Sequence, residues 1–420
     1  MGGRLLPCVV FAMTDTVHPD TEDDVRDAVA AALADGTPIE VVGAASKRGL
    51  GRPVTARRTL SLAALTGITL YEPAELVLTA KAGTPLAEID AALAEHGQQL
   101  AFEPPDWGPL LGGDAKQATI GGAIACNLAG PRRIRAGAAR DHLLGARMVT
   151  GRGETIKTGG RVVKNVTGYD LCKLLAGSHG TLAVLTEVSV KVLPRPEKTR
   201  TVMVFGQDEA GALAAMTAAL NSPHDVSGAA WLPADLAARS AVGHVAKAGA
   251  AVTAIRIEGT APSVAARRDA LRELFAGYGA AEELHFHNSA TFWAEIGDGA
   301  PFVHGTYAPV WRVSAPPAEL PRIAAAIRTR CLAELYADWG GGLIWVRVAP
   351  DTEDAGAAAV RGAIAPCGGH ATLIRAEEDI RARVPVFQPA APAIAALNAR
   401  LKHGFDPAHI LNRGRMVAGG

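Results

Sequence analysis

The stretch VVKNVTGYDLCKLLAGSHGTLAVLTEVSVKV, residues 162–192, is the part of this sequence that decides its fold. In it, a Gly-Tyr-Asp-Leu turn is followed by a Gly-Ser-His-Gly-Thr loop and then by an apolar run. Apolar side chains alternate with polar ones in residues 182–192, a period that predicts a strand with one buried face. Glycine is dense from residue 108 to residue 180, so segments before this strand are too short for long helices.

A second segment, VVGAASKRGLG at residues 41–51, directly follows a predicted strand at 38–42. Its glycines and small residues let the backbone approach a ligand closely, and successive N–H groups can hold an anion. Lys47 and Arg48 add positive charge beside it. The segment matches neither G-x-x-x-x-G-K-[ST] nor G-x-G-x-x-G, which excludes P-loop and Rossmann sites. An ordinary surface loop is the alternative interpretation.

The third segment, TIGGAIACNLAGP at residues 119–131, has almost no side-chain bulk. A large planar ligand lying against backbone needs such a surface, whereas a packed core does not. Thr119 could hydrogen-bond a phosphate and Asn127 could orient a polar ligand group. A tight packing turn is the alternative. Cys126 is interpreted as a small buried side chain, not a nucleophile, because no charged activator neighbours it in sequence.

The composition limits the class of protein. The chain has 420 residues with 42 basic and 42 acidic side chains, and 49% of its residues are hydrophobic. Single cores rarely grow past roughly 250–300 residues, so two domains are expected. Intrinsic disorder is excluded because it requires low hydrophobicity and high net charge. A neutral balance also argues against nucleic acid as the main partner.

The cysteine pattern indicates a reduced protein. There are five cysteines, and none belongs to a C-x-x-C pair. An odd number of scattered cysteines does not indicate a disulfide framework, so a cytoplasmic protein is expected. The same spacing excludes an iron–sulfur cluster held by clustered cysteines. The cysteines are Cys8, Cys126, Cys172, Cys331 and Cys367.

The beginning of the chain carries an apolar stretch, residues 5–13. It is far shorter than the roughly 20 residues that span a bilayer. No small-x-small cleavage site of a signal peptide follows it. We therefore expect residues 1–18 to be a loose extension and predict no transmembrane segment.

Periodicity and capping residues predict the remaining elements of the first domain. Thr21 is expected to cap a helix that ends at Gly36. Residues 76–80 form a predicted strand. Thr84 is expected to cap a second helix with Pro85 at its first position, and this helix runs to Gly97.

After the prolines at 194 and 196, strands and helices alternate. Strands are predicted at 201–205, 251–257, 308–313 and 343–348, and helices at 208–220, 261–276, 317–329 and 354–363. This alternation is typical of an α+β sheet, and a final helix is predicted at 391–402. The expected divisions are an extension at 1–18, a first domain at 19–195, a middle domain at 196–375 and a tail at 376–420 that returns to the first domain.

Taken together, the three segments resemble the FAD-binding domain of the vanillyl-alcohol oxidase superfamily, also called the p-cresol methylhydroxylase (PCMH) type. The resemblance covers about residues 20–195. DPAHILNRGRM at 406–416 resembles the closing motif FDP-x-x-ILNPGK/R of that superfamily, with Arg413 in place of the usual proline. The implied fold is α+β: a PCMH-type FAD-binding domain and a smaller α+β cap domain with an antiparallel sheet.

Within this superfamily, residues 160–188 and PPDWG at 104–108 are similar to the smaller of the FAD-binding subunits of bacterial glycolate oxidases (glycolate dehydrogenases). The K-N-V-x-G-Y-D-L motif of those smaller subunits stands at Lys164, Asn165, Val166, Gly168, Tyr169, Asp170 and Leu171.

The resemblance implies an FAD site with named residues. The pyrophosphate would be held by Gly43, Ala44, Ala45, Ser46, Lys47, Arg48 and Gly49. The rest of the flavin nucleotide would be lined by Thr119, Gly121, Gly122, Ala125, Asn127 and Gly130. Thr181, Leu182 and Val184 would lie along the adenosine half, and Asn412 belongs to the closing motif. Covalent members attach flavin through a histidine, often in the loop corresponding to 43–49. This loop has none, so non-covalent FAD is expected.

The resemblance also implies a function. Members that oxidise 2-hydroxy acids carry a His-x-Gly-Asp-Gly-Asn segment, whereas this chain has EIGDGA at 295–300, without the histidine or the asparagine. The catalytic residue is therefore unassigned. FAD is expected to serve electron transfer or structure beside a catalytic flavin subunit and an iron–sulfur subunit, in a complex that converts glycolate to glyoxylate. Membrane association, on the inner face, is expected only through these partners. The alternatives are a self-sufficient, D-lactate-like 2-hydroxy-acid dehydrogenase and a scaffold that has lost flavin.

Several polar residues of the middle domain remain open. Arg256, Arg312 and Arg347 could supply the cation for a substrate carboxylate, or they are ordinary ion-paired strand residues. His285 and His287 would share one face of a strand and could ligate a metal, but no third ligand is evident and no metal site is predicted. His179 either touches the flavin or caps its turn.

Overall fold

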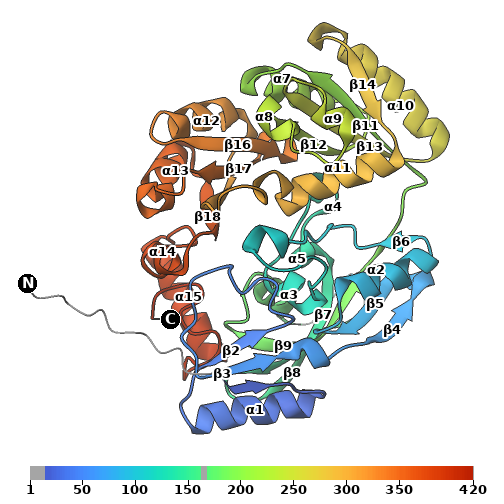
Figure 1. The fold of residues 1–420 in the computed structure, drawn as a ribbon. Helices are drawn as coiled ribbons and strands as arrows, with labels where there is room; N and C mark the ends of the chain where they lie inside the picture. Colours follow the sequence, from blue (N-terminus) through green and yellow to red (C-terminus); the bar gives the residue numbers. More distant parts are fainter. Residues whose placement is uncertain (1–14, 162–167, 420) are drawn as a thin grey trace, which may run out of the picture.

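The computed structural model describes residues 15–161 and 168–419. Most of the expected extension, with Cys8, lies outside the described residues, as do Lys164, Asn165 and Val166 of the turn motif. Two units stand one above the other in Figure 1: an N-terminal unit in blue to green, and a cap unit in green to orange. Among the described residues, no helix is long and apolar enough to cross a membrane.

The N-terminal unit opens with helix α1, Glu22–Ala34. Its N-terminus has the capping box that the sequence predicts: Asp24 N donates to Thr21 Oγ1, and Thr21 N donates to Asp24 Oδ2 at 3.0 Å. Val25 and Val29 are fully buried on its inner face. The first predicted helix is therefore confirmed.

Two sheets form the centre of the N-terminal unit (Figure 1). The larger has the strand order β4–β5–β9–β7–β8 and is antiparallel; the smaller has the order β1–β3–β2 and is parallel. Strand β9, Ala183–Lys191, lies at the middle of the larger sheet and confirms the predicted alternating strand. The other bounds are β1 Asp15–Val17, β2 Ile39–Val42, β3 Arg58–Ser61, β4 Ile68–Glu72, β5 Val77–Lys81, β7 Leu143–Thr150 and β8 Thr155–Gly159.

Helix α2, Leu86–Glu95, corrects one expectation. Leu86, Ile89 and Leu93 are buried as the spacing predicts, but Thr84 does not cap the helix. Pro85 has an extended ψ of 139° and is itself the N-cap, so Thr84 stands one residue too early. The Thr84 hydroxyl instead donates to Lys81 O at 2.7 Å and accepts from Gly67 N.

The cap unit is built on one antiparallel sheet with the order β14–β11–β13–β12–β16–β17–β15–β18. The bounds are β11 Lys198–Phe205, β12 Val226–Leu232, β13 Val252–Gly259, β14 Ala281–Leu284, β15 Val310–Ser314, β16 Ala333–Asp338, β17 Leu343–Val348 and β18 His370–Arg375. This sheet confirms the predicted antiparallel cap. The first unit's larger sheet ends at Lys191 and β11 begins at Lys198, which supports the boundary proposed near residue 195.

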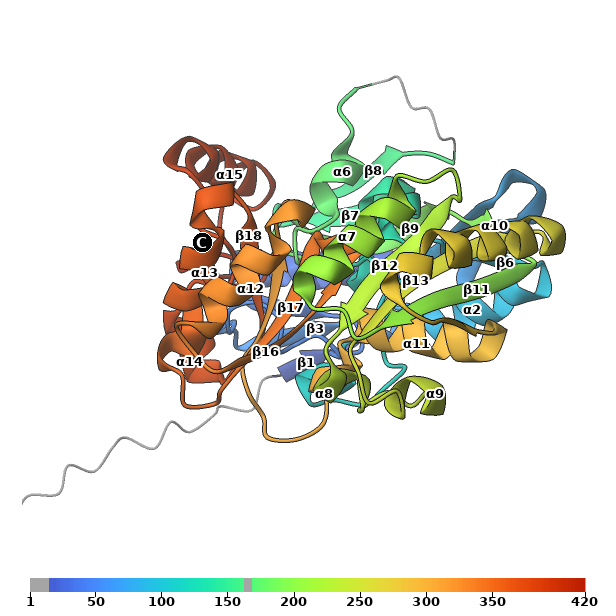
Figure 2. The same cartoon turned by 90° about the horizontal axis from the view of Figure 1, so that it is seen from above.

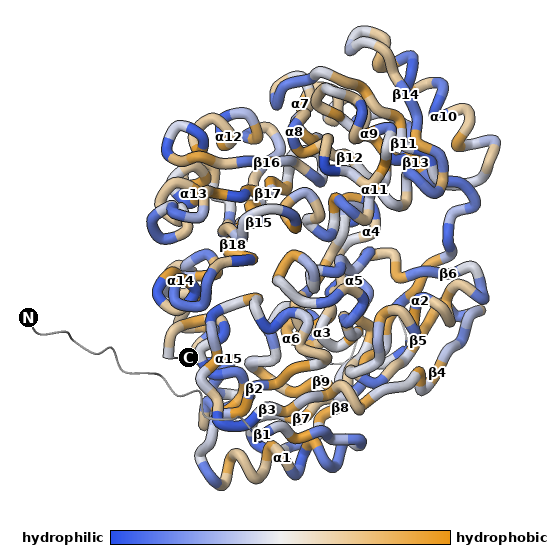
Figure 3. Tube along the Cα trace, viewed as in Figure 1, coloured by the Kyte–Doolittle hydropathy of each residue, from blue (hydrophilic) through white to orange (hydrophobic). Residues whose placement is uncertain are grey.

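Helices cover the outer face of the cap sheet, as seen from above in Figure 2. They are α7 Glu209–Leu220, α10 Ala261–Leu274, α12 Leu320–Arg328 and α13 Ala357–Ile364. The inner face packs on helix α11, Phe286–Asp298, and on the N-terminal unit. Because apolar side chains fill both faces, the strands show orange stretches in Figure 3.

Shorter elements connect these parts. They are β6 Gln98–Gln99, α3 Ile120–Ala125, α4 Arg133–Ala136, α5 Ala139–His142, α6 Leu171–Leu175, β10 Leu193–Pro194, α8 Ala234–Ala237, α9 Gly243–Ala246, α14 Glu378–Arg383 and α15 Pro392–Phe405. After α15 the chain returns to the first unit, where Leu411 forms a parallel bridge with Ile39. This contact supports the proposed division at the tail.

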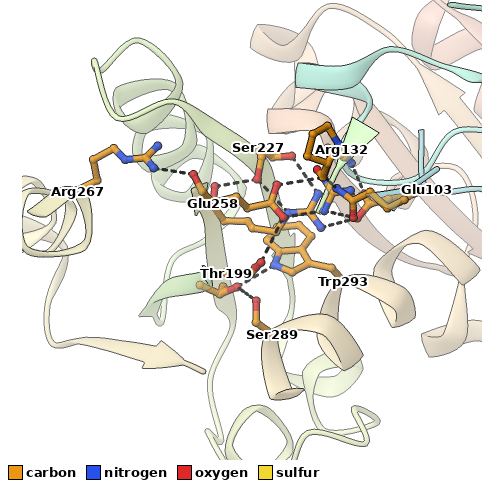
Figure 4. A network of polar contacts seen from close by, with 12 residues as sticks. Glu103, Arg132, Thr199, Ser227, Glu258, Arg267, Ser289 and Trp293 are labelled. Carbon is orange, nitrogen blue, oxygen red and sulfur yellow. Dashed lines mark hydrogen bonds and ion pairs between the residues drawn. The ribbon is translucent and has the colours of Figure 1, made fainter. Parts of the chain in front are cut away.

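A buried ionic network joins the two units (Figure 4). Glu103, in the loop after β6, accepts from Arg256 Nη1 at 2.8 Å and from Arg256 Nη2 at 3.0 Å. Arg132 pairs with both Glu103 and Glu258. Burial alone would raise the pKa of Glu258, but Arg256 and Arg132 lower it to about 2. The cap sheet is thus tied to the loop beside α4 by an ionic network in which the Glu258 carboxylate remains charged.

We predict that Glu103→Gln destabilises the protein by about 3–5 kcal/mol, because it leaves the 2%-exposed Arg256 without its charged partner. Denaturant unfolding followed by circular dichroism measures this change. The control is Asp23→Asn, which removes an exposed ion pair with Arg26 and should cost less than about 1 kcal/mol. Equal stabilities of the two variants would contradict the role given to the network.

Candidate functional site

A cavity of about 820 Å³, including its open side, lies in the N-terminal unit between the loop after β2, helix α3 and the C-terminal tail. The cavity brings together most of the residues that the sequence predicts. Those that line it are Gly43, Ala44, Ala45, Ser46, Lys47, Arg48, Thr119, Gly121, Gly122, Ala125 and Asn412.

Small side chains bring two backbone segments together at this cavity. A Cβ on Gly43 would collide with Thr119 Oγ1, so loop 43–49 and the start of α3 approach each other only with glycine there. The Thr119 hydroxyl accepts from Gly122 N at 3.3 Å and begins the helix. A Cβ on Gly121 would lie 2.7 Å from Ala82 O, so Gly121 also serves packing. The tight-packing interpretation of segment 119–131 thus fits Gly121, and its ligand-binding interpretation stays a prediction.

The cavity carries more positive than negative charge. Arg48 and Arg415 both pair with the buried Glu40, Arg415 at 2.8 Å. Lys47 has no carboxylate within 4 Å among the described residues, and its ammonium contacts only Ser46 Oγ at 3.2 Å. Burial lowers the pKa of Lys47, because the charged form loses water without gaining a partner. An anionic group in the cavity would supply that partner.

Some predicted residues do not line the cavity. Val184 is fully buried on the opposite face of β9, because strand side chains alternate; its neighbours Ala183 and Leu185 face the cavity. Leu182 is buried beside them. Thr181 instead donates its hydroxyl to Ser178 O at 2.7 Å.

Three further predicted residues lie behind the cavity wall. The side-chain oxygen of Asn127 accepts from Arg140 N at 2.9 Å, and Asn127 itself has a φ of 48°. A Cβ on Gly130 would lie 2.8 Å from the Glu103 side chain, so Gly130 is needed for packing. Gly49 faces Leu111.

The sequence interpretation missed several lining residues. From the tail, Arg415 lines the cavity beside the predicted Asn412, which accepts from Val41 N at 2.7 Å and donates to His179 O at 2.8 Å. The closing motif was the available signal for Arg415. The other missed residues are Val41, Val42, Leu50, Leu62, Ala82, Cys126, Ser178, Gly180, Ala183 and Leu185. His179, which the sequence left open between touching the flavin and capping its turn, also lines the cavity.

Neither His179 nor Cys126 has the properties of an active group at neutral pH. Burial, together with Arg415, lowers the pKa of His179 to about 4, and its ring lies 4.9 Å from that of Phe387. The imidazole is therefore neutral. Burial raises the pKa of the Cys126 thiol, which supports its interpretation as a small buried side chain.

The arginines and histidines of the cap that the sequence left open differ in their surroundings. Arg256 pairs with Glu103 and Arg347 with Glu334, whereas Arg312 has no carboxylate within 4 Å in the described part. The expectation that His285 and His287 share a strand face is wrong. His285 is the N-cap of α11 and His287 lies within the helix, because β14 ends at Leu284. In the described ranges, no group of His, Cys, Asp or Glu could hold a metal ion.

Comparison with known proteins identifies relatives of this chain. Residues 15–159 match a family model described as an FAD binding domain. The glycolate oxidase subunit GlcE of Escherichia coli (strain K12) is 35% identical over 408 residues, which cover 95% of this chain and 98% of that protein. The glycolate oxidase subunit GlcD of Bacillus subtilis (strain 168) is 35% identical over 159 residues, covering 38% of this chain and 31% of that protein.

A solved structure shows the same fold. The 4-ethylphenol oxidase from Gulosibacter chungangensis superposes with a TM-score of 0.71 at 14% identity, covering 96% of this chain and 89% of that one. The predicted PCMH-type α+β fold is thereby confirmed, and the matched domain identifies FAD as the cofactor. On the strength of the near full-length match, this chain belongs to the family of the glycolate oxidase subunit GlcE.

Proposed function

We propose that this chain is the FAD-carrying subunit of a complex that oxidises glycolate to glyoxylate, and that its own flavin serves electron transfer or structure. The cavity lining carries this proposal. It includes no carboxylate among the described residues, and its histidine, with a pKa of about 4, is a weak base. Hydroxy-acid oxidation requires a base whose pKa is near the working pH. A companion flavin subunit would supply it.

Relatives support oxidation of CH–OH donors as the reaction class. GlcE and GlcD are named as subunits of glycolate oxidase. A D-lactate dehydrogenase of Archaeoglobus fulgidus is 40% identical over 114 residues, covering 27% of this chain and 24% of that protein. All three names describe enzymes of small 2-hydroxy acids.

For the cofactor, we propose non-covalent FAD held by the cavity residues. FAD supplies two-electron chemistry when bound. The backbone of Gly43–Gly49 would face the pyrophosphate, with the unpaired Lys47 ammonium neutralising it. Thr119, Gly122 and Ala125 would line the flavin half. Gly49, Asn127, Gly130, Thr181, Leu182 and Val184 would shape the site from behind, since they lie outside the lining.

We predict that Lys47→Met lowers FAD affinity by about tenfold or more, because a charge-assisted contact contributes about 1.5–3 kcal/mol. Flavin absorbance in the supernatant after heat denaturation measures FAD per chain, and all of it should be released if the bond is non-covalent. Lys116→Met, at an exposed lysine, is the matched control. Flavin that stays in the pellet would contradict the non-covalent site, and full retention by Lys47→Met would contradict the role of that residue.

We propose that electrons that reach this flavin leave through another protein. The cysteines that the structure describes, Cys126, Cys172, Cys331 and Cys367, are free, and no His/Cys/Asp/Glu group in the described ranges fits a metal. An iron–sulfur partner subunit would accept the electrons. Any association with the inner face of the membrane would then come from the partners.

The isolated, FAD-loaded chain should not be reduced by glycolate. We expect the flavin absorbance to stay unchanged for minutes after mixing with excess glycolate or D-lactate in a stopped-flow spectrometer. Addition of the co-purified partner subunits should produce rapid bleaching. Rapid bleaching of the chain alone would instead establish the self-sufficient dehydrogenase, the alternative that the unpaired Arg312 of the cap favours.

Helix α15 offers a surface for a companion subunit. Residues 388–400 are all exposed, and Ile394 and Leu397 are 52% and 42% exposed. A helix this apolar is normally covered. No acidic residue occurs between 388 and 405, so the complementary surface would be an apolar groove with a carboxylate rim. The helix is firmly attached at its end, where the buried Lys402 pairs with Asp406 at 2.6 Å and donates to Thr181 O.

We predict that Leu397→Asp reduces recovery of the companion subunits in affinity co-purification by about tenfold, as expected for a buried anchor. The FAD content of the variant should stay unchanged. Leu332→Asp is the matched control, because Leu332 is also an exposed leucine, at 82%, on the cap. Equal recovery with both variants would exclude α15 as the docking helix.

A further inference from the structure

Arg312 occupies an unusual position on the inner face of the cap sheet. It lies in β15, and its guanidinium carbon is 4.6 Å from the ring centroid of Trp339 and 5.9 Å from that of Trp107. Arg133 of helix α4 approaches the same Trp339 ring at 4.7 Å. Two guanidinium groups, one from each unit, therefore gather around one indole where the units meet.

Arg312 and Arg133 lack the carboxylate partner that neighbouring arginines have in the described part of the chain. Arg132, Arg256 and Arg347 are each ion-paired to a glutamate. In the part of the chain that the structure describes, no carboxylate lies within 4 Å of Arg312 or Arg133. Arg312 Nε is also buried with no hydrogen-bond partner. Buried donors are nearly always satisfied, so an orphan donor on a cation requires an explanation.

A second donor without a partner stands beside Arg312. Trp345 is its register partner on β17, so the two side chains share the inner face. Trp345 is 1% exposed, and its Nε1 has no acceptor. Two adjacent donors, one of them charged, thus lack an acceptor in the same place.

The local charge is also uncompensated. Burial, together with Arg133, lowers the pKa of Arg312 to about 10. Asp338 is close enough to act on Arg312, but burial raises the pKa of Asp338 to about 7, so it is only partly ionised at neutral pH. His370 adds a further basic group, and Arg312 and Arg133 lower its pKa after the larger effect of burial. An anion would relieve this repulsion.

We propose that Arg312, with Arg133 and the Trp345 indole N–H, binds a small carboxylate where the cap sheet meets the N-terminal unit. Arg133 is exposed, whereas Arg312 Nε and Trp345 Nε1 are buried, so the anion would enter from the side of Arg133. None of these residues lines the flavin cavity. The identity of the ligand rests on the proposed function: the carboxylate is that of a 2-hydroxy acid or its 2-oxo product. A planar guanidinium presents paired donors that suit a carboxylate better than a lysine would.

Calorimetric titration of the full, FAD-loaded chain with sodium glycolate tests this site. We expect saturable binding of glycolate, no binding of ethylene glycol, which lacks the carboxylate, and weaker binding of inorganic phosphate. Arg312→Gln should lower the affinity for glycolate at least tenfold. Arg133→Gln should lower it at least threefold, and this exposed residue can be replaced without endangering the fold.

Arg135→Gln is the matched control, because Arg135 lies on the same helix as Arg133 but pairs with Asp225. Its affinity should stay within twofold of the unaltered protein. Unchanged affinity in both Arg312→Gln and Arg133→Gln would overturn the proposal, as would tighter binding of phosphate or no binding of glycolate. Failure of the proposed function would be seen in a different measurement. Glycolate would then rapidly bleach the flavin of the isolated chain, whether or not Arg312 is replaced.

Discussion

The buried pair of Glu103 and Arg256 fixes how the cap sheet sits on the N-terminal unit. Arg256 is almost inaccessible to water, so it must keep a carboxylate, and the one it has comes from the other unit. Two further hydrogen bonds lie at the same junction. Trp339 Nε1 donates to Gly130 O at 3.1 Å and Trp107 Nε1 donates to Gly297 O at 3.1 Å. These two hydrogen bonds hold the segment around Gly130 and the C-terminal end of α11 at the junction between the units.

The zero net charge of the chain conceals a marked separation of charge. Lys47, Arg48 and Arg415 line the cavity with a single carboxylate, Glu40, behind them, and at the junction Arg312 and Arg133 have no carboxylate partner among the described residues. Nearby acids offset little of this. Burial raises the pKa values of Asp298 and Asp338 to about 7, so neither is fully ionised at neutral pH. Both places are therefore suited to anions, although the overall composition gives no sign of it.

The sequence predicts an element correctly where a short stretch of residues is enough to specify it. The capping box of Thr21 and Asp24 and the alternation in β9 involve residues a few positions apart, so they are visible in the sequence. The predicted cap at Thr84 is wrong because Pro85 could stand either at the N-cap or at the first helical position, and the structure places it at the N-cap. His285 and His287 were misassigned because β14 ends at Leu284, a boundary that packing against β11 sets. The unpredicted strands β12, β14, β16 and β18 likewise depend on partners far along the chain.

The sequence by itself predicted a backbone-lined ligand site, because the glycines and small residues in 43–49 and 119–131 are a local property. It also determined the class of cofactor, through the order of its motifs. Only the tertiary structure decided which cations are free to meet an anion. Within residues 15–161 and 168–419, Lys47 and Arg312 have no carboxylate partner, whereas Arg415 and Arg256 are neutralised by Glu40 and Glu103, 375 and 153 residues away. Ion pairing acts through space, so the sequence does not reveal it until the chain has folded.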